Sequence, residues 1–155
     1  MTPVGILRST DTGVDLEITR AIDAPREDVW ATLTESDRTA GWFGPWERLS
    51  ENSIRVQMRF EEGAPWMEMN VELCESPDRL AVASVGGWQL EVRLTDSTTL
   101  TLIHHLPSTE GIGEIGPGWE YYLDNLLASR DGTPLPSFDD YYPVQKDYYT
   151  ALSPR

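Results

Sequence analysis

The hydrophobic pattern of this chain changes its period once, close to Pro107, and that change constrains the fold more than any other feature. Between residues 14 and 106, apolar and polar side chains alternate in short runs separated by turn residues, a pattern typical of half-buried antiparallel strands. After Pro107 the apolar residues recur at helical intervals, as at Ile115, Trp119 and Leu126. This order predicts an α+β domain in which one long C-terminal helix packs across a curved antiparallel sheet.

The alternating runs also predict where each element begins and ends. Strands are expected at residues 14–22, 54–60, 67–73, 80–85, 88–94 and 100–105, and short helices at residues 25–33 and 37–42. Pro25 suits the first turn of the first helix, and Gly44-Pro45 ends the second. Pro117 is expected to begin the long helix, with residues 111–116 forming a loop, and Asp131-Gly132 to end it.

The composition limits the classes of function that fit. A chain of 155 residues can bury one good core. Its formal charge of −14, from 26 acidic and 12 basic residues, repels nucleic-acid phosphates and anionic lipids, so no nucleic-acid partner is expected. We expect a cytoplasmic protein without membrane insertion, because no apolar run has the length of a membrane span and the N-terminus lacks a secretory pattern. The single cysteine, Cys74, is expected to be a small buried hydrophobe.

Five short motifs follow one another in a characteristic order. They are ITRAIDAP at residues 18–25, VW at 29–30, WFGP at 42–45, TLIHH at 101–105 and GWEYYLDNL at 118–126. Together they resemble the AHSA1-like (activator of Hsp90 ATPase homologue) branch of the START/Bet v 1 superfamily, also called SRPBCC, over residues 14–130. The resemblance implies a helix-grip fold, in which seven antiparallel strands curl around the C-terminal helix and leave an apolar cavity. It also implies hydrophobic ligands such as lipids or polyketides for some relatives, and cyclase or dehydratase activity for others.

The last part of the chain extends past the usual end of such a domain. We therefore expect one domain at residues 1–132 and a C-terminal extension at residues 133–155. The extension is too aromatic to be a free tail, with Phe138, Tyr141, Tyr142, Tyr148 and Tyr149. These side chains are expected to pack on the domain itself or on a partner subunit, which leaves a homodimer open.

The side chains expected on the inner faces of the strands and of the long helix would line the cavity. Methionines cluster there, and their flexible thioethers suit an adaptable apolar surface. The predicted ligand-binding residues are Trp42, Phe43, Met58, Phe60, Met67, Met69, Trp88, Leu90, His104, Trp119, Tyr122 and Leu123. Each of them could instead only fill the core, and Trp42 and Phe43 could either gate the cavity or plug its end.

The chain has two histidines, His104 and His105, and only His104 is a weak candidate for chemistry, together with Tyr122. His104 shares the face of Leu100 and Leu102, so with Tyr122 it could act as a general acid or base, or it could be a satisfied core histidine. His105 points to the opposite face, so the pair is not expected to bind a metal ion. No nucleophile constellation, phosphate loop or cofactor signature occurs. We expect no cofactor, and the pattern favours binding over catalysis.

Three functions are compatible with these observations. The first is binding of a hydrophobic or amphipathic small molecule, lipid-like or polyketide-like, in an internal cavity. The second is a cyclase- or dehydratase-like enzyme that uses His104 and a tyrosine such as Tyr122. The third is a chaperone-interacting module, which is the least supported, because the region that precedes this domain in the eukaryotic co-chaperones of the family is not seen here.

Overall fold

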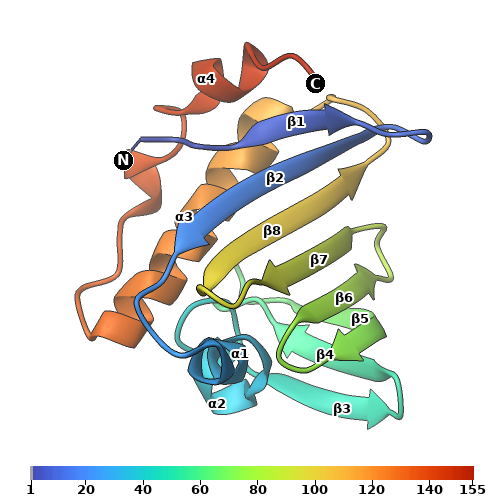
Figure 1. The fold of residues 1–155 in the computed structure, drawn as a ribbon, viewed down its shortest axis with the longest axis vertical. Helices are drawn as coiled ribbons and strands as arrows, with labels where there is room; N and C mark the ends of the chain where they lie inside the picture. Colours follow the sequence, from blue (N-terminus) through green and yellow to red (C-terminus); the bar gives the residue numbers. More distant parts are fainter. Residues whose placement is uncertain (1) are drawn as a thin grey trace.

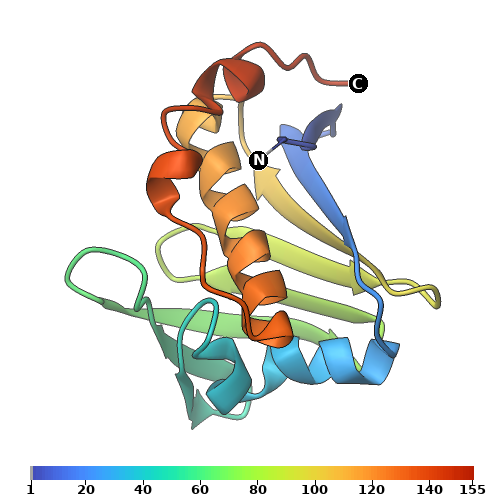
Figure 2. The ribbon, with the colours of Figure 1, turned by 90° about the vertical axis from the view of Figure 1, so that its left-hand side faces the viewer.

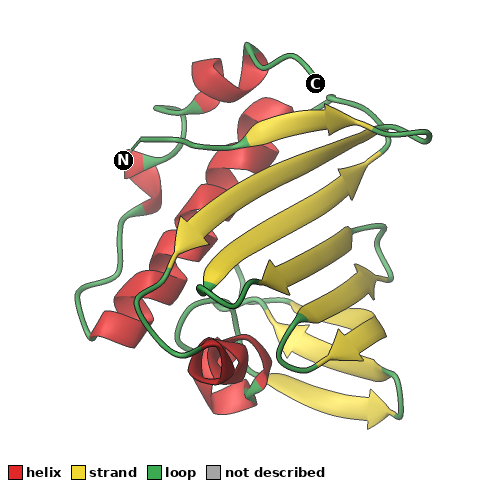
Figure 3. Cartoon of the chain, in the orientation of Figure 1, coloured by secondary structure: helices red, strands yellow, loops and turns green. Residues whose placement is uncertain are grey.

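Eight strands form one antiparallel sheet in the order β1-β2-β8-β7-β6-β5-β4-β3 (Figures 1 and 3). This computed structural model describes residues 2–155. The strands are β1 (Ile6–Ser9), β2 (Val14–Ala21), β3 (Trp46–Ser50), β4 (Ser53–Gln57), β5 (Trp66–Glu75), β6 (Arg79–Ser84), β7 (Gln89–Leu94) and β8 (Thr99–Leu106). Because β8 pairs with β2 along its whole length, the β1–β2 hairpin and the meander from β3 to β8 form one sheet.

A long helix, α3 (Ile112–Asp131), crosses the concave face of this sheet (Figure 2). Two short helices, α1 (Arg26–Thr34) and α2 (Ser36–Thr39), follow β2 and lie beside the lower end of the sheet in Figure 1. The predicted helix-grip fold is therefore confirmed. Its sheet has eight strands, because β1 and β3 extend the two edges beyond the six strands that the alternation predicted. None of the helices within residues 2–155 combines the length and the apolar character that a bilayer span requires.

The start of α3 differs from the prediction. The helix begins at Ile112, and Pro117 lies inside it, so residues 112–116 are helical and not a loop. Gly111, with φ of 77°, turns the chain into the helix. A Cβ on Gly116 would lie 2.3 Å from the ring of Tyr149, which shows how closely this turn packs on the C-terminal segment. That packing offsets the hydrogen bond that proline removes from a helix.

Two strands also depart from simple alternation. The strand expected over residues 54–60 ends at Gln57, because Met58 donates its N–H to Pro65 (2.7 Å) and starts a turn that contains Phe60. In β5 the register shifts between Val71 and Leu73, so one extra residue enters the strand and reverses the side-chain alternation beyond it. Cys74 is consequently exposed and on the concave side, which corrects its expected burial.

The C-terminal segment lies along the outer side of α3, through the short helices η1 (Phe138–Asp140) and α4 (Lys146–Thr150) (Figure 2). Tyr141 and Tyr149 are fully buried there. Tyr149 donates its hydroxyl hydrogen to Glu120, which is also bound by Arg20 at 2.7 Å. Tyr141 donates to the half-buried Asp124 (2.5 Å), so both acidic side chains, Glu120 and Asp124, have a partner from the segment.

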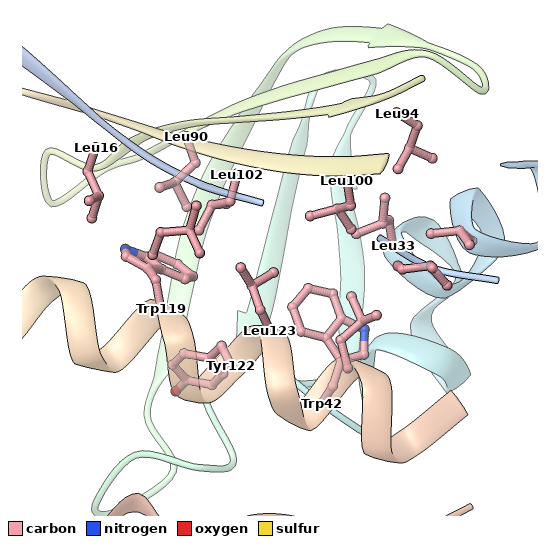
Figure 4. Close-up of a cluster of buried hydrophobic side chains, with 14 of the residues drawn as sticks. Leu16, Leu33, Trp42, Leu90, Leu94, Leu100, Leu102, Trp119, Tyr122 and Leu123 are labelled. Atoms are coloured by element: carbon pink, nitrogen blue, oxygen red, sulfur yellow. The ribbon is translucent and has the colours of Figure 1, made fainter. Parts of the chain in front are cut away.

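Neither edge strand of the sheet, β1 or β3, is a regular strand with all of its outer backbone groups free. On β1, Leu7 accepts a hydrogen bond from the N–H of Arg155, and Ser9 donates one to the carbonyl of Arg155, each at 2.9 Å. On β3, the pairing with β4 shifts register between Arg48 and Ser50. The core between sheet and helices is continuous and includes Leu16, Leu90, Leu102 and Leu123 from both layers (Figure 4).

Candidate functional site

A cavity of about 440 Å³ lies between the concave face of the sheet, the α1–α2 region and α3. This volume falls in the range of about 300–1,000 Å³ that is usual for small-molecule sites. Its floor is formed by alternate residues of β4 to β8, which are apolar. The floor residues that are fully buried include Val56, Met69, Leu90, Leu100 and Leu102.

The floor becomes more exposed away from α3. Val71, Leu80 and Val82 also line the cavity but are only half-buried, although they face the concave side. Beyond them, the exposed thiol of Cys74 and the exposed β3–β4 hairpin complete the lining. The cavity therefore has a closed end at α3 and an open mouth lined by this hairpin and by Cys74 of β5.

One wall of the cavity is aromatic and is held in place by internal hydrogen bonds. The indole N–H of Trp42 donates to the Thr32 carbonyl at 2.9 Å, and that of Trp46 donates to the Thr34 carbonyl at 3.0 Å. Between them, Gly44 packs so tightly that a Cβ would lie 1.7 Å from the carbonyl oxygen of Gln57. Because these contacts fix the segment in place, they favour a role in which it closes the end of the cavity over one in which it opens and closes to admit a ligand.

At the closed end, Trp119 separates the cavity from His104. The Trp119 indole donates to Nδ1 of His104 at 3.0 Å, so the remaining proton of the neutral ring belongs on Nε2. Burial lowers the pKa of His104 to about 4, and the nearby charge of His105 adds to this effect. His104 is thus a neutral acceptor for Trp119 near neutral pH, which is the satisfied core histidine that the sequence left open.

Tyr122 faces a different region from the cavity. Figure 4 shows Trp119 and Leu123 directed toward the strands, whereas the Tyr122 hydroxyl points away from them. This hydroxyl is buried and makes no hydrogen bond to any of the described residues. Burial raises the pKa of Tyr122, and the carboxylate of Glu61 raises it further. The ring packs on Phe43 with centroids 5.2 Å apart.

The twelve predicted ligand residues fall into two groups of six, one that lines the cavity and one that does not. Trp42, Phe43, Met69, Leu90, Trp119 and Leu123 line the cavity, whereas Met58, Phe60, Met67, Trp88, His104 and Tyr122 do not. Met58 and Phe60 belong to the turn after β4, and Trp88 precedes β7 and packs on the Trp119 ring at 5.4 Å. Ligand binding by either group of residues stays a prediction.

Several cavity residues were missing from the prediction. Arg48, Glu51 and Asn52 supply the polar mouth, and they lie on a hairpin that the alternation did not show. The dipeptide Glu51-Asn52, between two strand-forming runs, is the signal that could have indicated a two-residue turn there. Cys74 was missed because a bulge leaves no trace in the hydrophobic pattern.

Comparison with known proteins identifies relatives by structure. No protein-family model matches the chain, and no curated protein does. CalU16 from Micromonospora echinospora is 25% identical and superposes with a TM-score of 0.76, over 97% of this chain and 96% of CalU16. DynU16, of the dynemicin biosynthetic locus, is also 25% identical, with a TM-score of 0.65 over 80% of this chain but only 50% of DynU16.

A third neighbour carries the name of the resembled family. The AHSA1-like protein from Aeromonas hydrophila is 16% identical, with a TM-score of 0.65 over 76% of this chain and 92% of its own. Its likeness concerns the fold. Together these neighbours show that the chain has the helix-grip fold, as its ordered motifs predicted.

Proposed function

We propose that this protein binds a hydrophobic or amphipathic small molecule in the cavity between its sheet and its helices. The supporting observation is the chemistry of the wall: Trp42, Trp46 and Trp119 all line the cavity, and each indole N–H is already bonded within the protein. Such a wall offers apolar surface and no competing donor. An apolar ligand would displace water there without leaving a buried polar group unpaired.

An enzyme that uses His104 and Tyr122 receives less support from the geometry. The Nδ1 atom of His104 is occupied by Trp119, and neither His104 nor Tyr122 lines the cavity. A general acid or base must come within hydrogen-bond reach of its substrate. A chaperone-interacting role would favour a collapsed cavity beneath an exposed apolar patch, and the cavity is open.

Dye binding to a filled cavity tests the proposal. Val71→Trp should fill the cavity from its half-buried floor and weaken binding of anilinonaphthalene sulfonate at least about tenfold. Asn70→Trp is the matched control, because it adds the same side chain to the neighbouring exposed position on the convex face. Unchanged dye affinity in a folded Val71→Trp protein would contradict the proposal.

The single cysteine shows where the dye sits. Cys74 is exposed and lines the mouth, so a ligand in the cavity should slow its alkylation by iodoacetamide. Dye that binds without protecting Cys74 would occupy another surface and would count against the cavity. Native mass spectrometry of the freshly purified protein would then identify any molecule that co-purifies.

A further inference from the structure

The charged side chains and side-chain amides that line the cavity are all at its mouth. Inside, the Thr34 hydroxyl donates to the Trp30 carbonyl at 2.8 Å, and the Thr39 hydroxyl donates to the Gly44 carbonyl at 2.7 Å. With the indoles bonded as well, a ligand in the closed end meets hydrocarbon and aromatic faces. Within the part of the chain that the structure describes, charged side chains and side-chain amides line the cavity only at the hairpin, at Arg48, Glu51 and Asn52.

Of these three, Arg48 is the one that the fold positions. Its Nη1 donates to the carbonyl of Glu51 at 2.8 Å and to that of Ser50 at 3.5 Å, and its guanidinium carbon lies 5.9 Å from the ring centroid of Trp46. A guanidinium has five N–H donors, so several remain for another partner. Because the group is held before a ligand arrives, little side-chain entropy is lost on binding.

Glu51 offers the opposite charge but is not held in the same way. No ion pair involves its carboxylate among the described residues, and the residue is exposed at the tip of the hairpin. A cationic group would have to order this free side chain. The net charge of −14 weakens attraction of anions, yet it acts over a Debye length of about 8 Å and is largely screened at the mouth.

We infer that Arg48 binds a hydrogen-bond-accepting head group of an amphipathic ligand, a carboxylate or a carbonyl, while the apolar body of that ligand lies against Trp119 and Leu123 at the closed end. This inference rests on the proposed function and assigns an orientation and a ligand class to the same cavity. The ligand enters body first, and its head stays at the hairpin.

Three probes with one alkyl chain test this orientation. Decanoate, decanol and decylammonium differ only in the head group, and each is titrated against bound anilinonaphthalene sulfonate by competition. Decanoate should bind at least about fivefold more tightly than decylammonium, because a charge-assisted hydrogen bond to an exposed arginine is worth about 1 kcal/mol. Arg48→Gln should remove this preference and leave decanol unaffected.

Arg55→Gln is the matched control, since it removes the same charge from the next strand. Arg55 faces the convex side, where it pairs with Glu47 at 2.7 Å and lies over Trp66. Three outcomes would overturn the inference while cavity binding stands. The preference for decanoate could persist in Arg48→Gln, it could be lost equally in Arg48→Gln and Arg55→Gln, or decylammonium could bind more tightly than decanoate. If no probe displaces the dye, the proposed function fails and the orientation fails with it.

Discussion

Trp119 and His104 form the one hydrogen-bonded pair of polar side chains between α3 and the concave face of β8 among the described contacts. The contribution of this hydrogen bond to stability depends on the protonation state of His104, a residue that is 4% exposed. A protonated imidazole has no acceptor nitrogen, so protonation would break the bond to Trp119 and place a charge in the core. This residue therefore couples acid pH to the closed end of the cavity.

The stability of the protein should fall in mild acid because of His104. Its pKa drops from 6.5 to about 4 on folding, so between these values the unfolded chain binds a proton that the folded chain does not. The stability is present above pH 6.5 and is lost as the pH falls toward 4. Urea unfolding at pH 7 and pH 5 should show a loss of about 2 kcal/mol from this residue.

His104→Asn isolates that contribution, because an amide oxygen can still accept from Trp119 but does not titrate near these pH values. The parent should lose about 2 kcal/mol more than the variant between the two pH values. Identical pH dependence in the two proteins would show that His104 does not control the acid sensitivity.

At the scale of elements, side-chain alternation was a good guide where a strand is regular. The runs expected at 80–85, 88–94 and 100–105 correspond to β6, β7 and β8. The alternation failed as a guide where the backbone is irregular, at the turn after Gln57 and at the bulge near Leu73. Neither irregularity changes the kinds of residue in the sequence, so the hydrophobic pattern does not show it. Half of the predicted lining residues reach the cavity. Met58 and Phe60 do not, because they belong to the turn after β4, and His104 does not, because it lies behind Trp119. The mouth was missed because short edge strands such as β3 have little inward face.

The segment between α2 and β3 depends on one glycine. Gly44→Ala must displace the Gln57 carbonyl or the aromatic wall, because the added Cβ would lie 1.7 Å from that oxygen. We expect a loss of at least about 2 kcal/mol in chemical denaturation and weaker dye binding. Gly118→Ala is the control: no atom lies within 4 Å of the new Cβ in α3, so it should stabilise by about 0.5–1 kcal/mol. Equal stabilities for the two variants would refute this account.

At the scale of the whole molecule, the C-terminal segment completes the outer layer of α3. Arg20 from β2, Glu120 and Asp124 from α3, and Tyr141 and Tyr149 from the segment form one connected network. Glu120 is 1% exposed, so its charge needs these partners. Removing any one element leaves a buried carboxylate with an incomplete set of hydrogen bonds.

Truncation after Gly132 should therefore destabilise the domain. The two fully buried tyrosines alone predict a loss of at least about 3 kcal/mol, or a Tm lower by roughly 10 °C. Val144→Ala, at a position 69% exposed, should change the Tm very little. Light scattering on the truncated protein tests the homodimer: an unchanged mass fits a segment docked on its own chain, and a shift from dimer to monomer would reassign it to a partner.

The treatment of the two sheet edges has a consequence for self-association. An open edge strand invites another chain to add to the sheet, which is a route to aggregates and fibrils. The backbone of Arg155 already occupies bonding groups of β1, and β3 is short, carries Glu47 and Arg48, and has its register broken. The sheet is thereby guarded against growth at both ends. A concentrated solution of this protein should resist templated polymerisation through its edges.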